Sequence, residues 1–122
     1  MKTVLVADDS KIIQDLIEKA LKKDYIVVKA FDGYEAIKAI IDNPNSISCL
    51  LLDLKMPKYD GFQVLEYFKS NNLFDKIPIS IISGDDTKDT IDKAFKYDIV
   101  DMLNKPFSKE NILNIVNKTI TR

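Results

Sequence analysis

Short apolar segments alternate with longer amphipathic segments along the whole chain. The short segments are rich in β-branched and large aliphatic residues, and several are apolar almost throughout, which is typical of strands covered on both faces. We therefore predict strands at Val4–Ala7, Tyr25–Ala30, Ser48–Leu52, Ile77–Ile82 and Ile99–Leu103.

The segments between these strands carry apolar residues at helical spacing. In the first of them, the residues predicted to face the core are Ile12, Ile13, Leu16, Ile17, Ala20 and Leu21. Those predicted to face away from the core are Lys11, Gln14, Asp15, Glu18 and Lys22. The later helices are predicted to include Tyr34–Ile41, Phe62–Phe68, Thr90–Phe95 and Ile112–Ile120.

This alternation of strands and helices predicts an α/β fold in which helices cover both faces of a parallel sheet. Right-handed crossover connections restrict such a chain to a few doubly wound arrangements. The length of 122 residues suits one domain, and no linker or repeat interrupts the pattern. We therefore expect a single domain over residues 1–122.

The composition excludes several kinds of chemistry, because the chain has no histidine, no tryptophan and one cysteine. Ser-His-Asp catalysis, histidine-bound zinc and imidazole acid–base chemistry all need a residue that is missing. A disulfide within one chain needs two cysteines, so a reducing, cytoplasmic setting is expected. A formal net charge of -1 gives no general attraction to nucleic acid or to anionic membranes.

Polar residues follow the predicted strands at the points where the strands end. Asp8 and Asp9 follow the first strand, Asp53 the third, Ser83-Gly84 the fourth and Lys105 the fifth. In a parallel sheet these positions share one edge, which is where ligands bind to open α/β sheets. Each feature alone is more often a helix cap or a turn, so their joint placement is what indicates a site.

This set of side chains suits phosphoryl transfer. Clustered carboxylates repel one another unless a cation lies among them, and with oxygen ligands alone Mg²⁺ is the natural choice. An Asp in such a site can attack phosphorus and form an aspartyl phosphate. Lys105 and the metal can neutralise the phosphoryl oxygens, Ser83 can donate a hydrogen bond, and Gly84 leaves space for the incoming group.

Four blocks of the sequence carry a family resemblance. They are residues 6–10 (VADDS), 51–61 (LLDLKMPKYDG), 81–84 (IISG) and 104–107 (NKPF). With these blocks, in this order, the chain resembles the receiver domains of bacterial two-component response regulators over essentially its whole length. Within that family it is most similar to single-domain receivers of the chemotaxis-regulator type.

The resemblance implies a flavodoxin-like sheet in strand order 2-1-3-4-5 and a cis peptide bond between Lys105 and Pro106. It implies that Asp53 accepts a phosphoryl group from the phosphohistidine of a sensor histidine kinase or a histidine phosphotransfer protein. Ser83 and Lys105 would contact that group. The residues implied to bind Mg²⁺ are Asp9 directly, Asp8 partly through water, Asp53, and Lys55 through its backbone carbonyl.

The resemblance further implies a switch rather than an enzyme, apart from its own phosphoryl transfer and slow autodephosphorylation. The output would be a change at the face of the fourth helix, fifth strand and fifth helix, read by an unknown partner or output domain. We expect no direct binding to nucleic acid or membrane, and either a monomer or a dimer that forms on phosphorylation.

The chain departs from the family pattern at Met102, where the family usually has Tyr or Phe. In the family, that aromatic side chain turns inward when the Ser or Thr moves toward the phosphoryl group. Whether Met102 takes part in such a switch stays open, because a flexible methionine can fill a cavity without flipping between two defined positions. Lys55 and Asp85 each lie two residues beyond a site residue, where they could pair across the site entrance, and we expect them to influence how easily water reaches the phosphoryl group.

Three alternative functions are weighed against this one. A receiver-like scaffold that works without phosphorylation is favoured by Met102 but opposed by the complete set of site residues. A Mg²⁺-dependent phosphohydrolase commonly has an Asp-x-Asp motif after its first strand, whereas Asp8 and Asp9 are adjacent in this chain. A flavodoxin-type cofactor site is opposed by the absence of a glycine- and hydroxyl-rich phosphate loop after the first strand.

Overall fold

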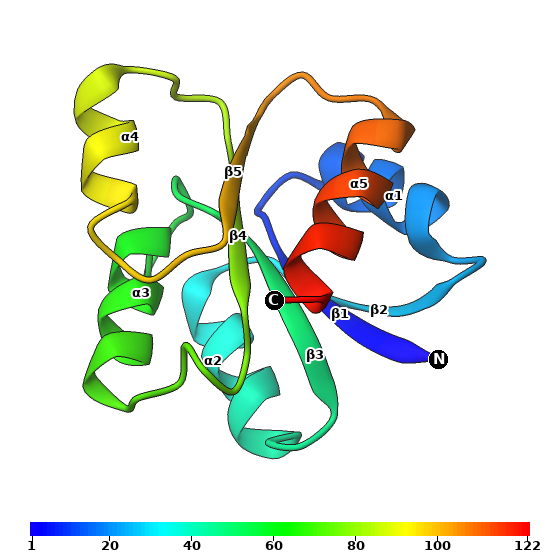
Figure 1. The fold of residues 1–122 in the computed structure, drawn as a ribbon, viewed down its shortest axis with the longest axis horizontal. Coiled ribbons are helices and arrows are strands. Elements are labelled where there is room, and N and C mark those ends of the chain that lie inside the picture. Colours follow the sequence, from blue (N-terminus) through cyan, green and yellow to red (C-terminus); the bar gives the residue numbers. More distant parts are fainter.

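A parallel sheet forms the centre of the computed structural model, which describes residues 1–122 (Figure 1). Its strands are β1 (Lys2–Ala7), β2 (Tyr25–Ala30), β3 (Ile47–Asp53), β4 (Ile79–Ser83) and β5 (Asp101–Asn104). They lie in the order β2-β1-β3-β4-β5, and every neighbouring pair is parallel. The predicted doubly wound fold and the strand order implied by the resemblance are therefore confirmed.

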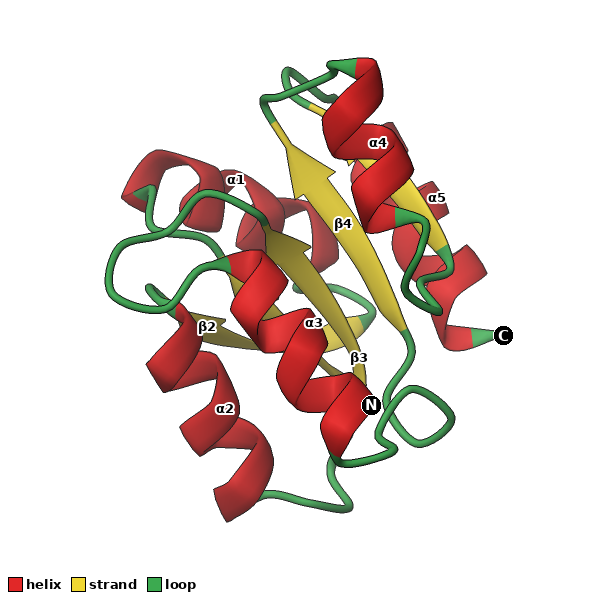
Figure 2. Ribbon diagram, turned by 90° about the vertical axis from the view of Figure 1, so that its left-hand side faces the viewer, coloured by secondary structure: helices red, strands yellow, loops and turns green.

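Helices cover both faces of this sheet, as Figures 1 and 2 show. On one face lie α1 (Lys11–Leu21) and α5 (Lys109–Ile120). On the other lie α2 (Gly33–Asp42), α3 (Gly61–Ser70) and α4 (Lys88–Ala94). The result is a three-layer domain in which the central strands β1, β3 and β4 are shielded from solvent on both sides.

The sheet has an apolar core on each face. The core beneath α2, α3 and α4 contains 18 buried residues, and the core beneath α1 and α5 contains 11. Successive side chains of β1 alternate between them, so that Leu5 packs into the first core and Val4 and Val6 into the second. This double burial explains why the strands read as continuous apolar runs.

The first helix corrects the predicted pattern of buried residues. Ile12 was expected in the core but is 81% exposed, whereas Gln14 was expected in solvent and is fully buried. The reason is geometric, because Gln14 precedes the buried Ile17 and Leu21 by three and seven residues and so shares their stripe. The spacing therefore decides the burial. The amide nitrogen of Gln14 donates to the backbone carbonyls described below, whereas its buried amide oxygen accepts no hydrogen bond.

The predicted limits of β4 and β5 also need correction. Ile77 and Ile99 were assigned to these strands because they are apolar, and both are indeed buried. They lie outside the strands, however, since β4 begins at Ile79 and β5 begins at Asp101. Pro78 has no N–H for a sheet ladder, so the pairing of β4 starts only after it.

None of the helices combines the length and the apolar character that a membrane span requires.

Candidate functional site

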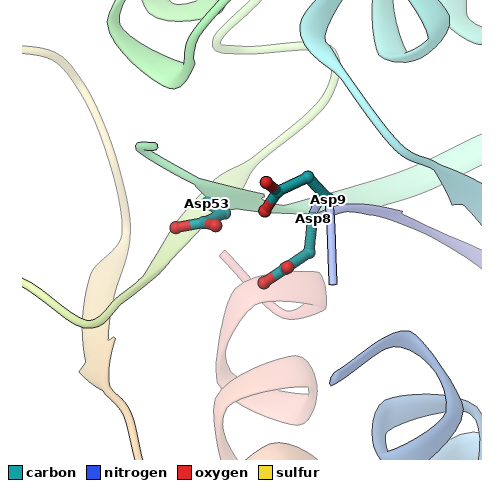
Figure 3. Close-up of side chains that lie close together, drawn as sticks. All are labelled: Asp8, Asp9 and Asp53. Atoms are coloured by element: carbon teal, nitrogen blue, oxygen red, sulfur yellow. The ribbon is translucent and has the colours of Figure 1, made fainter. Parts of the chain in front are cut away.

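The residues expected to form a site come together at the carboxyl edge of the sheet. Asp8 and Asp9 follow β1, Asp53 ends β3, Ser83 ends β4, and Lys105 follows β5. Figure 3 shows the three aspartate side chains gathered beside these strand ends. One carboxylate oxygen from each of them lies within 4.8 Å of the others.

The ammonium of Lys105 joins two of these carboxylates. Its Nζ lies 2.8 Å from Oδ2 of Asp8 and 3.3 Å from Oδ2 of Asp53. Asp8 is fully buried and Asp53 is 4% exposed, whereas Asp9 faces solvent. The cluster thus contains three carboxylates but one ammonium, and it keeps an excess of negative charge that a divalent cation would balance.

The surroundings of Asp53 shift its protonation. Burial, and next the charge of Asp8, raise the pKa of Asp53 from 3.8 to about 6, although Lys105 and the backbone amide of Lys55 act in the opposite direction. Burial lowers the pKa of Lys105, but Asp8 and Asp53 outweigh this effect and hold that pKa above its ordinary value. The lysine is thus kept charged, whereas the pKa of the aspartate, at about 6, lies well above its ordinary value.

The oxygen atoms of the cluster suit a hard cation such as Mg²⁺. Oδ1 of Asp8 accepts a 2.8 Å hydrogen bond from the Ser10 amide, which fixes that carboxylate. Oδ2 of Asp8 is buried and accepts no directed hydrogen bond, even though Lys105 is close to it. A buried carboxylate oxygen whose one close partner is the ammonium of Lys105 keeps lone-pair capacity for a metal ion, so it is a suitable metal ligand.

The loops that follow β4 and β5 are held together at the site. The amide of Lys105 donates a 2.7 Å hydrogen bond to the carbonyl of Ser83, and the Lys105–Pro106 peptide bond is cis, as the resemblance implies. Met102 pairs with Ile81 of β4 and packs, half-buried, against the larger core. The backbone thus keeps Ser83 and Lys105 next to each other at the edge of the sheet.

Asp85 does not pair with Lys55 across the site entrance. Its Oδ1 accepts a 3.0 Å hydrogen bond from the amide of Thr87, and its Oδ2 accepts a 2.8 Å bond from the hydroxyl of Thr90. These bonds lower the pKa of Asp85, and the charge of Lys55 makes only the smallest contribution. The pair does not form because Asp85 is engaged at the start of α4, where Thr87 is the N-cap; an influence of Lys55 and Asp85 on the access of water stays a prediction.

A cleft of about 520 Å³ opens beside the cluster. Its lining includes Asp9, Lys55, Met56, Asp60, Phe62 and Thr90. It lies between the loop after β3 and the start of α4, so a group presented by another molecule can approach the exposed side of the site. Lys55 lines this cleft, and its role as a carbonyl ligand for the metal stays a prediction.

Gln14 also belongs to this region, although its polar side chain was predicted to face away from the core. Gln14 lies beneath the turn that carries Asp8 and donates hydrogen bonds to three backbone carbonyls there. Its spacing from Ile17 and Leu21 was the only signal in the sequence, and its polar side chain concealed that signal.

Comparison with known proteins identifies the family. The family model described as "Response regulator receiver domain" matches residues 4–117. The protein PilG of Pseudomonas aeruginosa is 40% identical over 118 residues, which are 93% of this chain and 83% of PilG. The chain therefore belongs to the response regulator receiver domain family, whose members are in general signalling domains rather than enzymes.

Other relatives are longer than this chain. Response regulator RR06 of Streptococcus pneumoniae is 35% identical over 122 residues, which are 98% of this chain but 53% of RR06. Hybrid signal transduction histidine kinase D of Dictyostelium discoideum is 34% identical over 116 residues, which are 93% of this chain and 7% of the kinase. Similar domains thus occur within much larger proteins.

Solved structures agree with the fold. The receiver domain of the Francisella response regulator 1452 is 32% identical, with a TM-score of 0.86 over 100% of this chain and 98% of that chain. A response regulator receiver domain protein from Clostridium thermocellum is 27% identical, with a TM-score of 0.88 over 100% of this chain and 96% of that chain. The fold and the acidic cluster together thus define a receiver domain.

Proposed function

We propose that residues 1–122 act as one phosphorylation-controlled switch in which Asp53 is the phosphoacceptor. The observation that carries this proposal is the arrangement of Asp53 and Asp8, two buried carboxylates joined by the ammonium of Lys105, with Asp9 at the same cluster. Nucleophile, countercharge and acidic ligands thus lie within reach of one phosphoryl group. The phosphohistidine that serves as donor has to lie outside residues 1–122, because these residues include no histidine.

The proposed step transfers a phosphoryl group from a phosphohistidine to Asp53. A carboxylate oxygen of Asp53 attacks phosphorus and forms a P–O bond, while the P–N bond to the histidine breaks. The electron pair of that bond stays with the imidazole, which takes up a proton from water. A pKa of about 6 keeps Asp53 mostly ionised at neutral pH, so the nucleophile is available there.

The remaining site residues have supporting roles in the proposal. Mg²⁺, held by Asp8, Asp9, Asp53 and the backbone carbonyl of Lys55, supplies charge neutralisation at the phosphoryl oxygens when bound. An acidic pocket of this kind is typical of Mg²⁺ binding in receiver domains. Lys105 pairs with the transferred group, and slow hydrolysis of the acyl phosphate by water resets the switch.

The proposed output is a population shift at the face built by α4, β5 and α5. Ser83 would leave its contacts with Asp85 and donate to the phosphoryl group, which alters the loop that leads into α4. Of the residues of α4, only Ala94 is buried, so this helix is weakly held and can respond to a small change. Phosphorylation acts because it interacts differently with the two arrangements.

The proposed partners are a sensor histidine kinase or a histidine phosphotransfer protein, and an output partner or domain that reads the switched face. Support for a kinase comes from relatives named as histidine kinases, including sensor histidine kinase CheAY of Helicobacter pylori. The protein would act in the cytoplasm as a monomer or as a dimer formed on phosphorylation.

Intact-mass spectrometry with phosphoramidate tests this function, because that donor carries a P–N bond like phosphohistidine. We expect one phosphoryl group on the wild-type chain with Mg²⁺, and none when the metal is chelated. Asp53→Asn should remain unmodified, whereas Asp75→Asn, at an exposed position away from the cluster, should behave like the wild type. Modification of Asp53→Asn, or modification that needs no Mg²⁺, would reject the assignment.

A further inference from the structure

Gln14 is a buried amide on α1 that the proposed phosphoryl chemistry does not use. It is fully buried, and its Nε2 donates to the backbone carbonyls of Val6 at 2.9 Å, Asp8 at 3.1 Å and Ala30 at 2.8 Å. A carboxamide nitrogen has two hydrogens, so one of them is shared between two carbonyls. An amide oxygen would be repelled by these three acceptors, and the surroundings therefore fix which way the amide points.

These three carbonyls lie at the ends of β1 and β2, and one of them belongs to Asp8, the first residue of the acidic pair. The amide of Asp8 also donates a 3.0 Å hydrogen bond to the carbonyl of Ala30. Asp8 is thus held through its N–H by β2 and through its carbonyl by Gln14, while its carboxylate is fixed by Ser10. The direction in which the chain leaves β1, and with it the placement of Asp8 and Asp9, depends on this amide.

We infer that Gln14 is a positioning residue for the Mg²⁺ site. It touches neither the metal nor the phosphoryl group, but it locks the turn that presents Asp8 and Asp9 to Asp53. The inference rests on the proposed function, because it concerns the same acidic cluster. Supporting groups of this kind commonly change metal affinity by about 10- to 100-fold when they are removed.

The variant Gln14→Met tests the inference, because methionine keeps nearly the same length and shape but cannot donate. Calorimetric titration with Mg²⁺ should show about tenfold weaker binding than in the wild type. The matched control is Thr119→Val, which removes the buried partner of Ser80 at the interface of β4 with α5, a 2.6 Å contact. It should lower stability in urea to a similar degree while leaving Mg²⁺ affinity unchanged.

The outcomes separate this inference from the proposed function. Equal Mg²⁺ affinity in Gln14→Met and the wild type would overturn the inference, as would an equal loss in Thr119→Val, which would indicate general destabilisation. A wild-type chain that binds no Mg²⁺ would contradict the proposed function, and the inference with it.

A measurement on the wild type covers the case in which Gln14→Met does not fold. NMR of the chain labelled selectively at glutamine gives signals from two side-chain amide groups, because Gln14 and Gln63 are the only glutamines. The signal of buried Gln14 should exchange slowly with solvent and shift on addition of Mg²⁺, whereas that of exposed Gln63 should exchange rapidly. Rapid exchange at Gln14, or no shift with Mg²⁺, would overturn the inference.

Discussion

The hydroxyl of Ser83 is bound to Asp85 in the structure rather than to Asp53. Its Oγ accepts a 3.0 Å hydrogen bond from the amide of Asp85 and donates a 3.2 Å bond to the carbonyl of the same residue. Asp85 in turn is bonded to Thr87 and Thr90 at the start of α4. Ser83 is therefore connected through one residue, Asp85, to the first turn of α4.

Ser83→Ala should separate phosphorylation from the response of α4. The hydroxyl that would move to the phosphoryl group is removed, while Asp53 and its acidic neighbours are unchanged. We expect the adduct on Asp53 to form, but the NMR shifts that phosphorylation causes in Lys88–Ala94 to be much smaller than in the wild type. The loss of stability should be about 1 kcal/mol.

Ser70→Ala, at the exposed end of α3, is the control for this experiment and should respond like the wild type. A full response of α4 in Ser83→Ala would show that the signal leaves the site by another route.

Asp53→Asn should make the metal-free protein more stable at neutral pH. The pKa of Asp53 is higher in the folded chain, about 6, than its ordinary value of 3.8, so ionisation of this residue disfavours folding. At about pH 7.5 the variant should gain about 3 kcal/mol in free energy of unfolding. Because folded Asp53 binds its proton as the pH falls through about 6, the gain should shrink and vanish near the ordinary pKa.

Urea unfolding over a pH series measures this effect, and Mg²⁺ supplies an internal control. The metal should stabilise the wild type and have little effect on Asp53→Asn, which reverses the order of the two proteins. A variant that is less stable than the wild type at every pH would show that burial and the charge of Asp8 do not raise the pKa of Asp53.

Lys105→Met should raise the pKa of Asp53 further. Lys105 opposes the effects of burial and of Asp8 through both its charge and its hydrogen bond. Without it we expect the pKa of Asp53 to rise by about 1–2 units, measured from the pH dependence of its carboxyl carbon resonance. Lys118→Met, which removes an exposed ion pair with Asp101, should leave that pKa unchanged; an unchanged value in Lys105→Met would refute the electrostatic account.

Two glycines should respond differently to alanine. A Cβ at Gly33 would lie 2.2 Å from the carbonyl oxygen of Tyr59, whereas one at Gly84 would meet no atom within 4 Å. Gly33 also donates a 2.8 Å hydrogen bond to that carbonyl, so α2 begins directly against the loop after β3. Gly33→Ala should lose about 2 kcal/mol of stability or more, and Gly84→Ala less than about 0.5 kcal/mol. Equal losses would mean that this loop does not depend on close contact with α2.

The strand ends could be predicted from the sequence because a parallel sheet brings the carboxyl ends of its strands to one edge. The cluster of Asp8, Asp9 and Asp53 follows from that topology once the strands are placed. The burial of Gln14 could not be predicted in the same way. Its helical spacing places it on the buried stripe of α1, but the pattern of apolar residues does not show that backbone carbonyls of the two strands flanking α1 accept its amide hydrogens.

The contacts of the loop after β4 could not be predicted from the sequence either. Asp85 could pair with Lys55 across the cleft or cap its own helix, and both choices satisfy its charge. The local choice prevails because the amide of Thr87 and the hydroxyl of Thr90 lie only two and five residues away, within hydrogen-bond distance of the Asp85 carboxylate. Sequence spacing alone does not distinguish a contact across a cleft from one within a turn.

The most direct test of the central claim is to locate the modified residue. The chain is phosphorylated with phosphoramidate and Mg²⁺ and then reduced with borohydride, which converts an aspartyl phosphate into homoserine. Peptide mass spectrometry should then find homoserine at position 53 and nowhere else. Homoserine at Asp8, Asp9 or another acid, with Asp53 intact, would contradict the assignment of Asp53 as the phosphoacceptor.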